Sequence, residues 1–235
     1  MAQEARVVGV EEECGFRWLR LKKLAYVDQT GRRRFWEMAE RTTRRGAVDG
    51  VGIVAVVRRR ARAPQVVLVT QFRPPLDGHV LELPAGLVDG GEGAGGAALR
   101  ELKEETGFVG TVASVSPVVA SDPGMSAANM QLVVVDVDGD APENLKPVAE
   151  PEEGEFITVL LVPLAGLAAR LRAEMKARGY HVDARLYAYA AASSSRRPRR
   201  RRPPRPGSPS PPARPWPSRP STCAATPRTA SSKVS

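Results

Sequence analysis

The segment 86–108, GLVDGGEGAGGAALRELKEETGF, constrains the fold of this 235-residue chain more than any other feature. Its glycine-rich loop leads into a helical pattern at about 97–106, which Gly107 ends in the usual C-terminal position. Runs of β-branched residues come before and after this loop and helix. A helix between strands, with further helical pattern near the C-terminus, predicts a mixed β-sheet between helices, an α/β/α sandwich of the α+β kind.

Strand patterns flank this segment on both sides. Runs rich in Val, Ile, Leu and aromatic residues predict strands at 15–28, 33–44, 49–59, 65–73, 80–86, 111–120, 130–138 and 154–163. Helical spacing of apolar residues follows at 164–179 and begins again at 182. The first two strands, joined by a turn at 29–32, predict a small N-terminal antiparallel β unit. Such a unit is marginal alone and must pack on the rest of the chain or on a second copy.

The charge of the chain is unevenly divided, which predicts three parts. The formal net charge is +9, yet residues 193–235 hold ten Arg and one Lys with no acidic residue. That segment also holds 11 of the 21 prolines and little apolar surface, so we expect it to be disordered. We therefore predict an N-terminal β unit at 1–46, a main domain at 47–192 and an Arg/Pro/Ser-rich tail at 193–235.

Composition argues against several classes of protein. There is no run of 18 apolar residues that would predict a membrane span, and the acidic start lacks the apolar region of a secretory signal. Cys14 and Cys223 lie at opposite ends of the chain and predict neither a disulfide framework nor a zinc cluster. We expect a cytoplasmic protein, with a nuclear location open if the basic tail acts as an import signal.

Three carboxylates on the central helix indicate a metal site. At roughly 100° per residue, Glu101, Glu104 and Glu105 fall within one sector about 100° wide. Like charges at this spacing repel each other by about 0.2–0.5 kcal/mol, so a surface helix gains nothing from them. Mg²⁺ takes such oxygen ligands and shares its other positions with water and substrate phosphates. For the Glu-Glu pair alone, a solvated acidic helix face is the simpler alternative.

The complete spacing resembles a known family motif. The pattern G-x5-E-x7-R-E-L-x-E-E-x-G-F, from Gly86 to Phe108, matches the Nudix box at every specified position. The resemblance implies the Nudix fold and a hydrolase that uses Mg²⁺, or Mn²⁺, to cleave nucleoside diphosphates linked to another moiety. It implies that the three glutamates bind metal and that Glu92 and Arg100 hold the loop against the helix by an ion pair. We count Arg100 among the catalytic residues for this reason.

The flanking segments resemble one particular group within the Nudix family. QFRPPLDGHVLELPAG, ASDPGMS, PENLKP, EEGEFITV and VDARLYAYA are similar to eukaryotic ADP-sugar (ADP-ribose) pyrophosphatases, from about Gly15 to Ala190. This implies hydrolysis of ADP-ribose and related ADP-sugars to AMP and a sugar phosphate. It also implies a domain-swapped homodimer in which Trp18 and Trp36 stack on the adenine, one from each subunit. Core packing is the alternative role for either tryptophan.

The same resemblance implies further substrate contacts. Glu37 and Arg41 match residues that contact the nucleotide, Leu87 matches one that lines its site, and Asp122 matches a loop residue that contacts the substrate. A guanidinium at Arg73 suits a bidentate clamp on a pyrophosphate. Each of these residues also has a structural alternative. Glu37 and Arg41 could be surface charges, and Arg73 could pair with a nearby acid. Leu87 could pack in the core, and Asp122 could cap a turn.

A backbone carbonyl and a late-loop glutamate complete the implied site. Ala85 precedes the box glycine, and its match supplies a carbonyl oxygen to the metal. Glu155 matches a glutamate that binds metal or serves as general base, with Glu152 and Glu153 as close rivals. The expected reaction is attack of a metal-activated water on one phosphorus, with Glu155 as the base.

Two other functions stay open. The same pocket could take another nucleoside diphosphate derivative, such as 8-oxo-dGDP, or NADH, because an aromatic sandwich tolerates other purines. A non-catalytic nucleotide- or RNA-binding protein is the third alternative, although it would not need the full carboxylate set. The tail is the one segment expected to bind nucleic acid, and it could equally be a localisation segment or a gene-model artefact. His79 and His181 have no evident partner and are expected to be structural or exposed.

Overall fold

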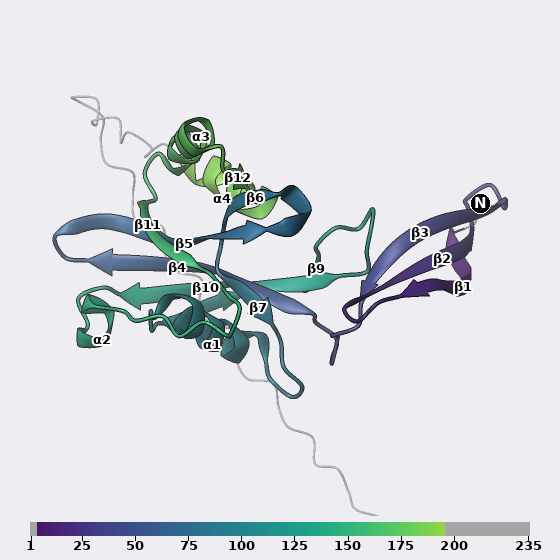
Figure 1. The fold of residues 1–235 in the computed structure, drawn as a ribbon, viewed down its shortest axis with the longest axis horizontal. Helices are drawn as coiled ribbons and strands as arrows, with labels where there is room; N and C mark the ends of the chain where they lie inside the picture. The colour runs from purple at the N-terminus through teal and green to yellow at the C-terminus, as the bar shows by residue number, and fades with distance from the viewer. Residues whose placement is uncertain (1–3, 196–235) are drawn as a thin grey trace, which may run out of the picture. The chain divides into compact units, whose positions relative to one another are not determined.

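The computed structural model describes residues 4–195, so nearly all of the tail predicted at 193–235 lies outside the described residues. Two β-sheets and four α-helices are formed within this range (Figure 1). The strands are β1 (Arg6–Gly15), β2 (Leu19–Val27), β3 (Arg33–Arg41), β4 (Gly50–Arg59), β5 (Arg62–Arg73), β6 (Gly78–Glu82), β7 (Ala85–Leu87), β8 (Thr111–Val115), β9 (Val119–Ala120), β10 (Asn129–Asp138), β11 (Thr158–Pro163) and β12 (His181–Val182). The helices are α1 (Ala94–Thr106), α2 (Pro142–Leu145), α3 (Leu167–Arg178) and α4 (Ala184–Ser195), with a 3₁₀ turn η1 at Pro74–Leu76. None of the helices between residues 4 and 195 has the length and apolar character that a membrane crossing requires.

The small sheet contains β1, β2 and β3 in that order, antiparallel throughout. The predicted N-terminal antiparallel unit is confirmed, but the expected number of two strands was wrong. The pattern of β1 was not recognised because nearly all of its side chains are exposed, so its sequence shows no buried face. Opposite charges join β1 to β2, where Glu12 lies 3.7 Å from Arg20 and Glu13 lies 3.9 Å from Lys23.

The large sheet is mixed, as predicted. Its strand order is β12-β6-β5-β4-β10-β8, with β11 paired to β5, β7 to β4 and β9 to β10. β4 and β10 run parallel from the pair Gly50–Met130 to the pair Arg58–Asp138. β5 pairs antiparallel with β4, β6 and β11 at different parts of its length. The predicted α/β/α sandwich is confirmed.

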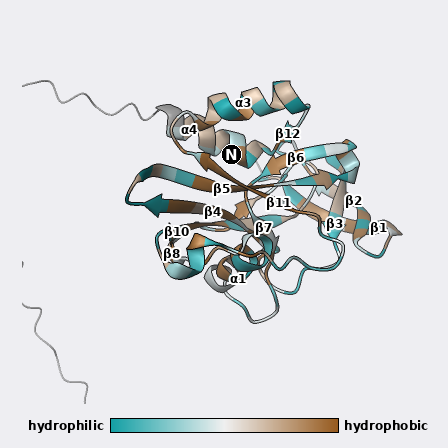
Figure 2. Ribbon diagram, turned by 60° about the vertical axis from the view of Figure 1, so that its left-hand side comes forward, coloured by the Kyte–Doolittle hydropathy of each residue, from teal (hydrophilic) through white to brown (hydrophobic). Residues whose placement is uncertain are grey.

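Helices cover both faces of this sheet, and β4 shows why. Its residues Val51, Ile53, Ala55 and Val57 belong to a core with α1, whereas Val54 and Val56 belong to a second core with α3 and α4. Figure 1 shows α1 and α2 on one side of the sheet and α3 and α4 on the other. β4 and β5 are apolar on both faces, which Figure 2 shows as brown strands between the helix layers.

The central helix begins earlier than predicted. α1 starts at Ala94 and not at about 97, because Gly95 and Gly96 form its first turn although glycine disfavours helix interiors. The predicted end is confirmed, since Gly107 has a left-handed φ of 74° and donates its N–H to the carbonyl of Lys103. The predicted strand at 111–120 is split into β8 and β9 on either side of Pro117, which cannot donate to a strand ladder.

Candidate active site

The three predicted metal-binding glutamates lie on α1 at different depths. Glu105 is buried, with 4% of its surface exposed, whereas the side chain of Glu104 is 38% exposed. The Oε2 atom of Glu105 accepts a hydrogen bond of 3.2 Å from the backbone N–H of Ala85. This bond joins α1 to β7. The structure therefore brings the backbone of Ala85 next to one of the predicted carboxylate ligands.

Gly86 allows α1 and β7 to approach closely. A Cβ atom built on Gly86 would lie 1.8 Å from Cδ of Glu101 and 2.0 Å from its Oε1. Any side chain at position 86 would displace this carboxylate. Glycine is therefore required here by the packing of the helix on the strand, and the backbone at 85–86 borders both Glu101 and Glu105.

Arg100 ties the loop, the helix and the carboxylates together. Its Nη2 donates to Glu92 and to the carbonyl of Leu87, both at 3.1 Å, so the ion pair that the family resemblance implies is present. Its Nη1 donates to Glu101 at 2.9 Å and to Glu104 at 3.0 Å. These partners, with Glu92 first, raise the pKa of Arg100 above its usual value. Leu87 itself has an exposed side chain, so it is not a core residue.

Burial and mutual repulsion make the carboxylates hard to ionise. Burial, together with the charges of Glu101 and Glu155, raises the pKa of Glu105 to about 8 against the opposing effects of the Ala85 N–H and the charge of Arg73. Burial also raises the pKa of Glu101, although Arg100 opposes it. A nearby positive charge would relieve both penalties, which is the electrostatic requirement of a cation site.

The donor set fits a hard divalent cation. Between residues 4 and 195, no three His, Cys, Asp or Glu side chains converge into a closed metal cluster. Mg²⁺ does not require one, since it is usually held by one or two carboxylates, waters and substrate phosphates. Buried Glu105, half-buried Glu101 and the adjoining backbone of Ala85 supply oxygen atoms of this kind along one side of α1.

The loop at 146–157 brings Glu155 toward the same cluster. The N–H of Glu150 donates to the carbonyl of Glu104 at 2.8 Å, which anchors the loop on α1. Glu155 then lies close enough for its charge to raise the pKa of both Glu101 and Glu105. Its own carboxylate accepts the N–H of Glu152 at 3.1 Å. Among the three glutamates considered for this loop, Glu155 is the one whose charge acts on both buried carboxylates.

Arg73 has an acidic partner, as the structural alternative for it expected, although the sequence did not show which residue this is. Its Nε and Nη2 donate to the two carboxylate oxygens of Glu82 at 3.0 and 2.6 Å, between the ends of β5 and β6. Glu82 occurs in an apolar strand pattern, and a charged residue in such a run was the available signal. The pair faces the cluster, because the charge of Arg73 lowers the pKa of Glu105. The guanidinium is thus preoriented at the site rather than free in solvent.

The predicted nucleotide contacts are gathered around β3 and the loop at 121–128. The indole Nε1 of Trp36 donates to the carbonyl of Gly124 at 3.1 Å, and Ala39 donates its N–H to Met125 at 2.9 Å. Asp122 lies in this loop, where its backbone carbonyl, and not its carboxylate, accepts the N–H of Met125 and Ser126. Glu37 and Arg41, also in β3, are exposed.

Trp18 lies away from Trp36 in the same chain. Trp36 is opposite Leu24 in the β2–β3 ladder, whereas Trp18 precedes Leu19, which is opposite Arg41. At about 3.4 Å per residue, the two tryptophans are separated by roughly 17–20 Å along the strands. Rings that stack on one base must each lie within about 4.5–7 Å of it. Within one chain the two rings are therefore carried by well-separated backbone positions. Both rings are exposed, at 58% and 49%.

A second unpredicted pair fixes the entry into the main sheet. The buried carboxylate of Asp49 accepts hydrogen bonds from Arg44 at 2.7 and 2.5 Å and from the N–H of Asn129 at 2.8 Å. Arg44 also donates to the carbonyl of Ala127 at 2.9 Å. The segment that leaves β3 is thereby joined to the loop that holds Trp36. Contacts between residues 80 positions apart leave no local pattern in the sequence.

Comparisons with known proteins agree with this geometry. The NUDIX domain model matches residues 47–186. The chain is 44% identical to the ADP-ribose pyrophosphatase of Saccharomyces cerevisiae over 185 residues, which covers 78% of this chain and 79% of that protein. It is 42% identical to the ADP-sugar pyrophosphatase of Mus musculus over 177 residues, covering 75% and 81%.

A solved structure shows the same fold. The crystal structure of an ADP compounds hydrolase superposes with a TM-score of 0.59 at 21% sequence identity, covering 81% of this chain and 92% of that one. Nudix enzymes generally need a divalent metal, and the carboxylates of α1 lie within the matched region. The matched domain and the extent of the identity show that this chain belongs to the Nudix hydrolase family.

Proposed function

We propose that this Nudix hydrolase uses Mg²⁺ to cleave ADP-ribose and related ADP-sugars into AMP and a sugar phosphate. One observation carries the chemistry: Glu105 is buried against the backbone of Ala85, with a pKa raised to about 8, beside Glu101. The substrate is inferred from the relatives in S. cerevisiae and M. musculus, whose names specify ADP-ribose and ADP-sugar.

The cluster on α1 would hold the metal. Glu101, Glu104, Glu105 and the carbonyl of Ala85 would be the ligands, with Mn²⁺ as the alternative ion and Glu155 as a further ligand or the general base. A bound divalent cation supplies positive charge to the diphosphate and increases the acidity of the attacking water. Glu155 would accept the proton from that water, since it reaches the cluster from an exposed loop.

Arg100 and Arg73 would act on different parts of the site, the first on the metal-binding glutamates and the second on the substrate. Arg100 hydrogen-bonds Glu101 and Glu104 and would keep them in the orientation that a metal requires. Arg73 would bind the pyrophosphate, because a guanidinium can hold phosphate oxygens in a bidentate manner while one edge stays on Glu82.

The nucleotide would lie along β3 and the loop at 121–128. Glu37 and Arg41 are exposed on β3, and Leu87 has an exposed side chain at the edge of the box loop. Asp122 is on the loop that accepts the indole N–H of Trp36. We propose that these four side chains contact the substrate as their family matches do.

A homodimer would complete the adenine site. Trp18 and Trp36 are exposed, and their backbone positions lie five to six residues apart along the β2–β3 ladder of one chain. Several other large apolar side chains of the small sheet are also exposed, including Val10, Phe16 and Phe35. A second copy that exchanges this sheet would bury them and would bring Trp18 of one subunit opposite Trp36 of the other.

The test is release of the nucleoside monophosphate by the purified full chain, AMP from the adenine compounds and 8-oxo-dGMP from 8-oxo-dGDP. ADP-ribose, ADP-glucose, 8-oxo-dGDP and NADH would be compared at equal concentration with Mg²⁺, and the leading substrate would be repeated with Mn²⁺ and with EDTA. We expect ADP-ribose to have the highest kcat/KM and EDTA to abolish turnover. A higher kcat/KM for 8-oxo-dGDP or NADH would contradict the proposal that ADP-ribose is the preferred substrate. Undiminished turnover in EDTA would contradict the proposed requirement for a divalent metal.

A further inference from the structure

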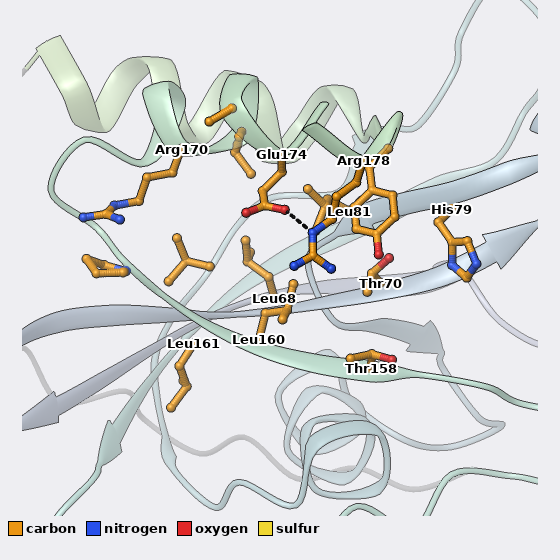
Figure 3. Close-up of a pocket in the computed structure, with 15 residues that line it drawn as sticks. Leu68, Thr70, His79, Leu81, Thr158, Leu160, Leu161, Arg170, Glu174 and Arg178 are labelled. Carbon is orange, nitrogen blue, oxygen red and sulfur yellow. Dashed lines mark ion pairs between the residues drawn. The ribbon is translucent and has the colours of Figure 1, made fainter. Parts of the chain in front are cut away.

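The helix α3 covers only part of the sheet face on which it lies. Its first half packs closely, with Leu167, Ala168 and Leu171 buried. Its second half carries Glu174 and Arg178 and lies over a cavity of about 380 Å³ between the helix and the sheet (Figure 3). The cavity is separated from the carboxylates of α1 by the sheet itself, because α1 and α3 belong to the cores on opposite faces.

The floor of this cavity is mostly apolar, and its polar groups are the hydroxyls of two threonines and the ring of His79. It is formed by alternate residues of β5, β6 and β11, which point to the same face: Leu68, Thr70, Leu81, Thr158 and Leu160. Thr70 is opposite Leu81 on one side and opposite Thr158 on the other. The alternation of these strands thus presents leucine side chains to the cavity, and α3 covers them with Leu171 and Ala173 only in part.

Thr70 is the feature that indicates a ligand. It is 5% exposed, and its Oγ1 atom has no hydrogen-bond partner among the described residues. A buried hydroxyl without a partner costs about 1–3 kcal/mol, and native proteins contain few of them. Thr70 lines the cavity, so a polar atom bound there would give its hydroxyl a partner.

The charges around the cavity favour an anion. Its charged lining residues are Arg170, Arg178 and Glu174, which carry a formal net charge of +1. Arg178 pairs with Glu174 at 2.9 Å, and Figure 3 shows its guanidinium directed from α3 toward the floor. A guanidinium has five N–H donors, so Arg178 can bind a second acceptor while it keeps this pair. The side chain of Arg170 forms no hydrogen bond or ion pair with the residues that the structure describes.

We propose that this cavity is a binding site for a small amphipathic monocarboxylate with an aliphatic body, separate from the active site. The carboxylate accepts hydrogen bonds from the hydroxyl of Thr70 and the guanidinium of Arg178. The aliphatic body covers Leu68 and Leu160 and extends under α3 toward Arg170. The volume lies within the range of ordinary ligand sites, which are mostly apolar with a few convergent polar groups.

The test is isothermal titration of the full chain with sodium octanoate, and with hexanoate and octan-1-ol as comparisons. We expect octanoate to bind with a Kd on the order of 1 mM. Removal of two methylenes in hexanoate should weaken binding about fifteenfold. Octan-1-ol should bind at least about tenfold more weakly, because it lacks the charge.

Variants locate the site. Arg178→Gln should weaken octanoate binding by about tenfold or more, and Thr70→Val by about threefold to tenfold. Lys176→Gln, which removes a positive charge from the same helix turn outside the cavity lining, should leave the Kd unchanged. Thermal unfolding and ADP-ribose turnover would verify that each variant is folded. Absence of binding at 10 mM, equal binding of octan-1-ol, or equal effects of R178Q and K176Q would each overturn the proposal. A Kd unaffected by T70V would also overturn it.

Discussion

The carboxylate of Glu101 occupies the space in which a side chain at Gly86 would begin, 1.8 Å from the position of a Cβ. The glycine and the glutamate are separated by a loop and two turns of helix, yet neither can change independently. The first glycine of the box therefore serves packing between β7 and α1, and this close approach holds the carboxylate against the backbone at 85–86.

Gly86→Ala should therefore remove activity without unfolding the protein. The new methyl group displaces Glu101, and we expect kcat for ADP-ribose to fall by roughly a hundredfold, as when one preorganised group is lost. Gly90→Ala is the matched control, since a Cβ at Gly90 meets nothing within 4 Å. Steady-state kinetics with circular dichroism would check both variants. Equal kcat values for G86A and G90A would show that the position of Glu101 is unimportant.

Glu105→Gln tests the buried carboxylate. The amide oxygen of glutamine can still accept the N–H of Ala85, so the fold should persist while the charge is lost. We expect turnover to fall by roughly a thousandfold, with the affinity for ADP-ribose within about threefold of the wild type. Single-turnover kinetics would measure the loss of turnover, and titration with ADP-ribose would measure the affinity separately. Glu143→Gln, on α2 and away from the cluster, should change neither quantity.

The residues of the Nudix box could be predicted from the sequence because they act locally. Glu92, Arg100 and the helix glutamates lie within 14 residues, so helical geometry alone brings them together. The end of the helix at Gly107 was predicted for the same reason, because a C-terminal glycine is a local signal. The start of the helix was not predicted, since Gly95 and Gly96 have a low helix propensity and locally favour a loop.

Long-range pairs could not be predicted in this way. The Arg73–Glu82 pair depends on the register of β5 and β6, and the Asp49–Asn129 bonds depend on how β4 and β10 lie side by side. Strand β1 was missed because it has no buried face within one chain. Local pattern predicts elements, whereas partners across strands and across subunits follow from tertiary and quaternary structure.

The Asp49–Arg44 pair should contribute to stability above pH 4. Burial acts to raise the pKa of Asp49, but the hydrogen bonds from Arg44 and Asn129 outweigh it and hold the pKa below its usual value of 3.8. A lowered pKa means that the ionised carboxylate is favoured in the folded state. Its contribution is therefore present above pH 3.8 and is lost as the pH falls below that value.

Asp49→Asn should accordingly destabilise the protein at pH 7 by about 1–3 kcal/mol, and by less at pH 3. Urea unfolding at the two pH values would measure the difference. Asp136→Asn removes the exposed pair with Arg58 and should cost about 0–1 kcal/mol at either pH. A difference between wild type and D49N that stays constant with pH would exclude the ionised pair as the cause.

Mixing two variants with weakened substrate binding tests the shared adenine site. Trp18→Ala and Trp36→Ala should each raise KM for ADP-ribose by roughly tenfold or more, because stacking contributes about 1–3 kcal/mol per base. The two tryptophans lie five to six residues apart along the β2–β3 ladder of one chain, and in the proposed homodimer each site takes one ring from each subunit. In a mixed dimer, one site would then lack both rings and the other would have both.

Unfolding and refolding an equal mixture of the two variants should restore about a quarter of the wild-type sites, since half of the dimers are mixed and each has one intact site. Refolded single variants are the controls, and a mixture no more active than they are would mean that both rings of a site come from one chain.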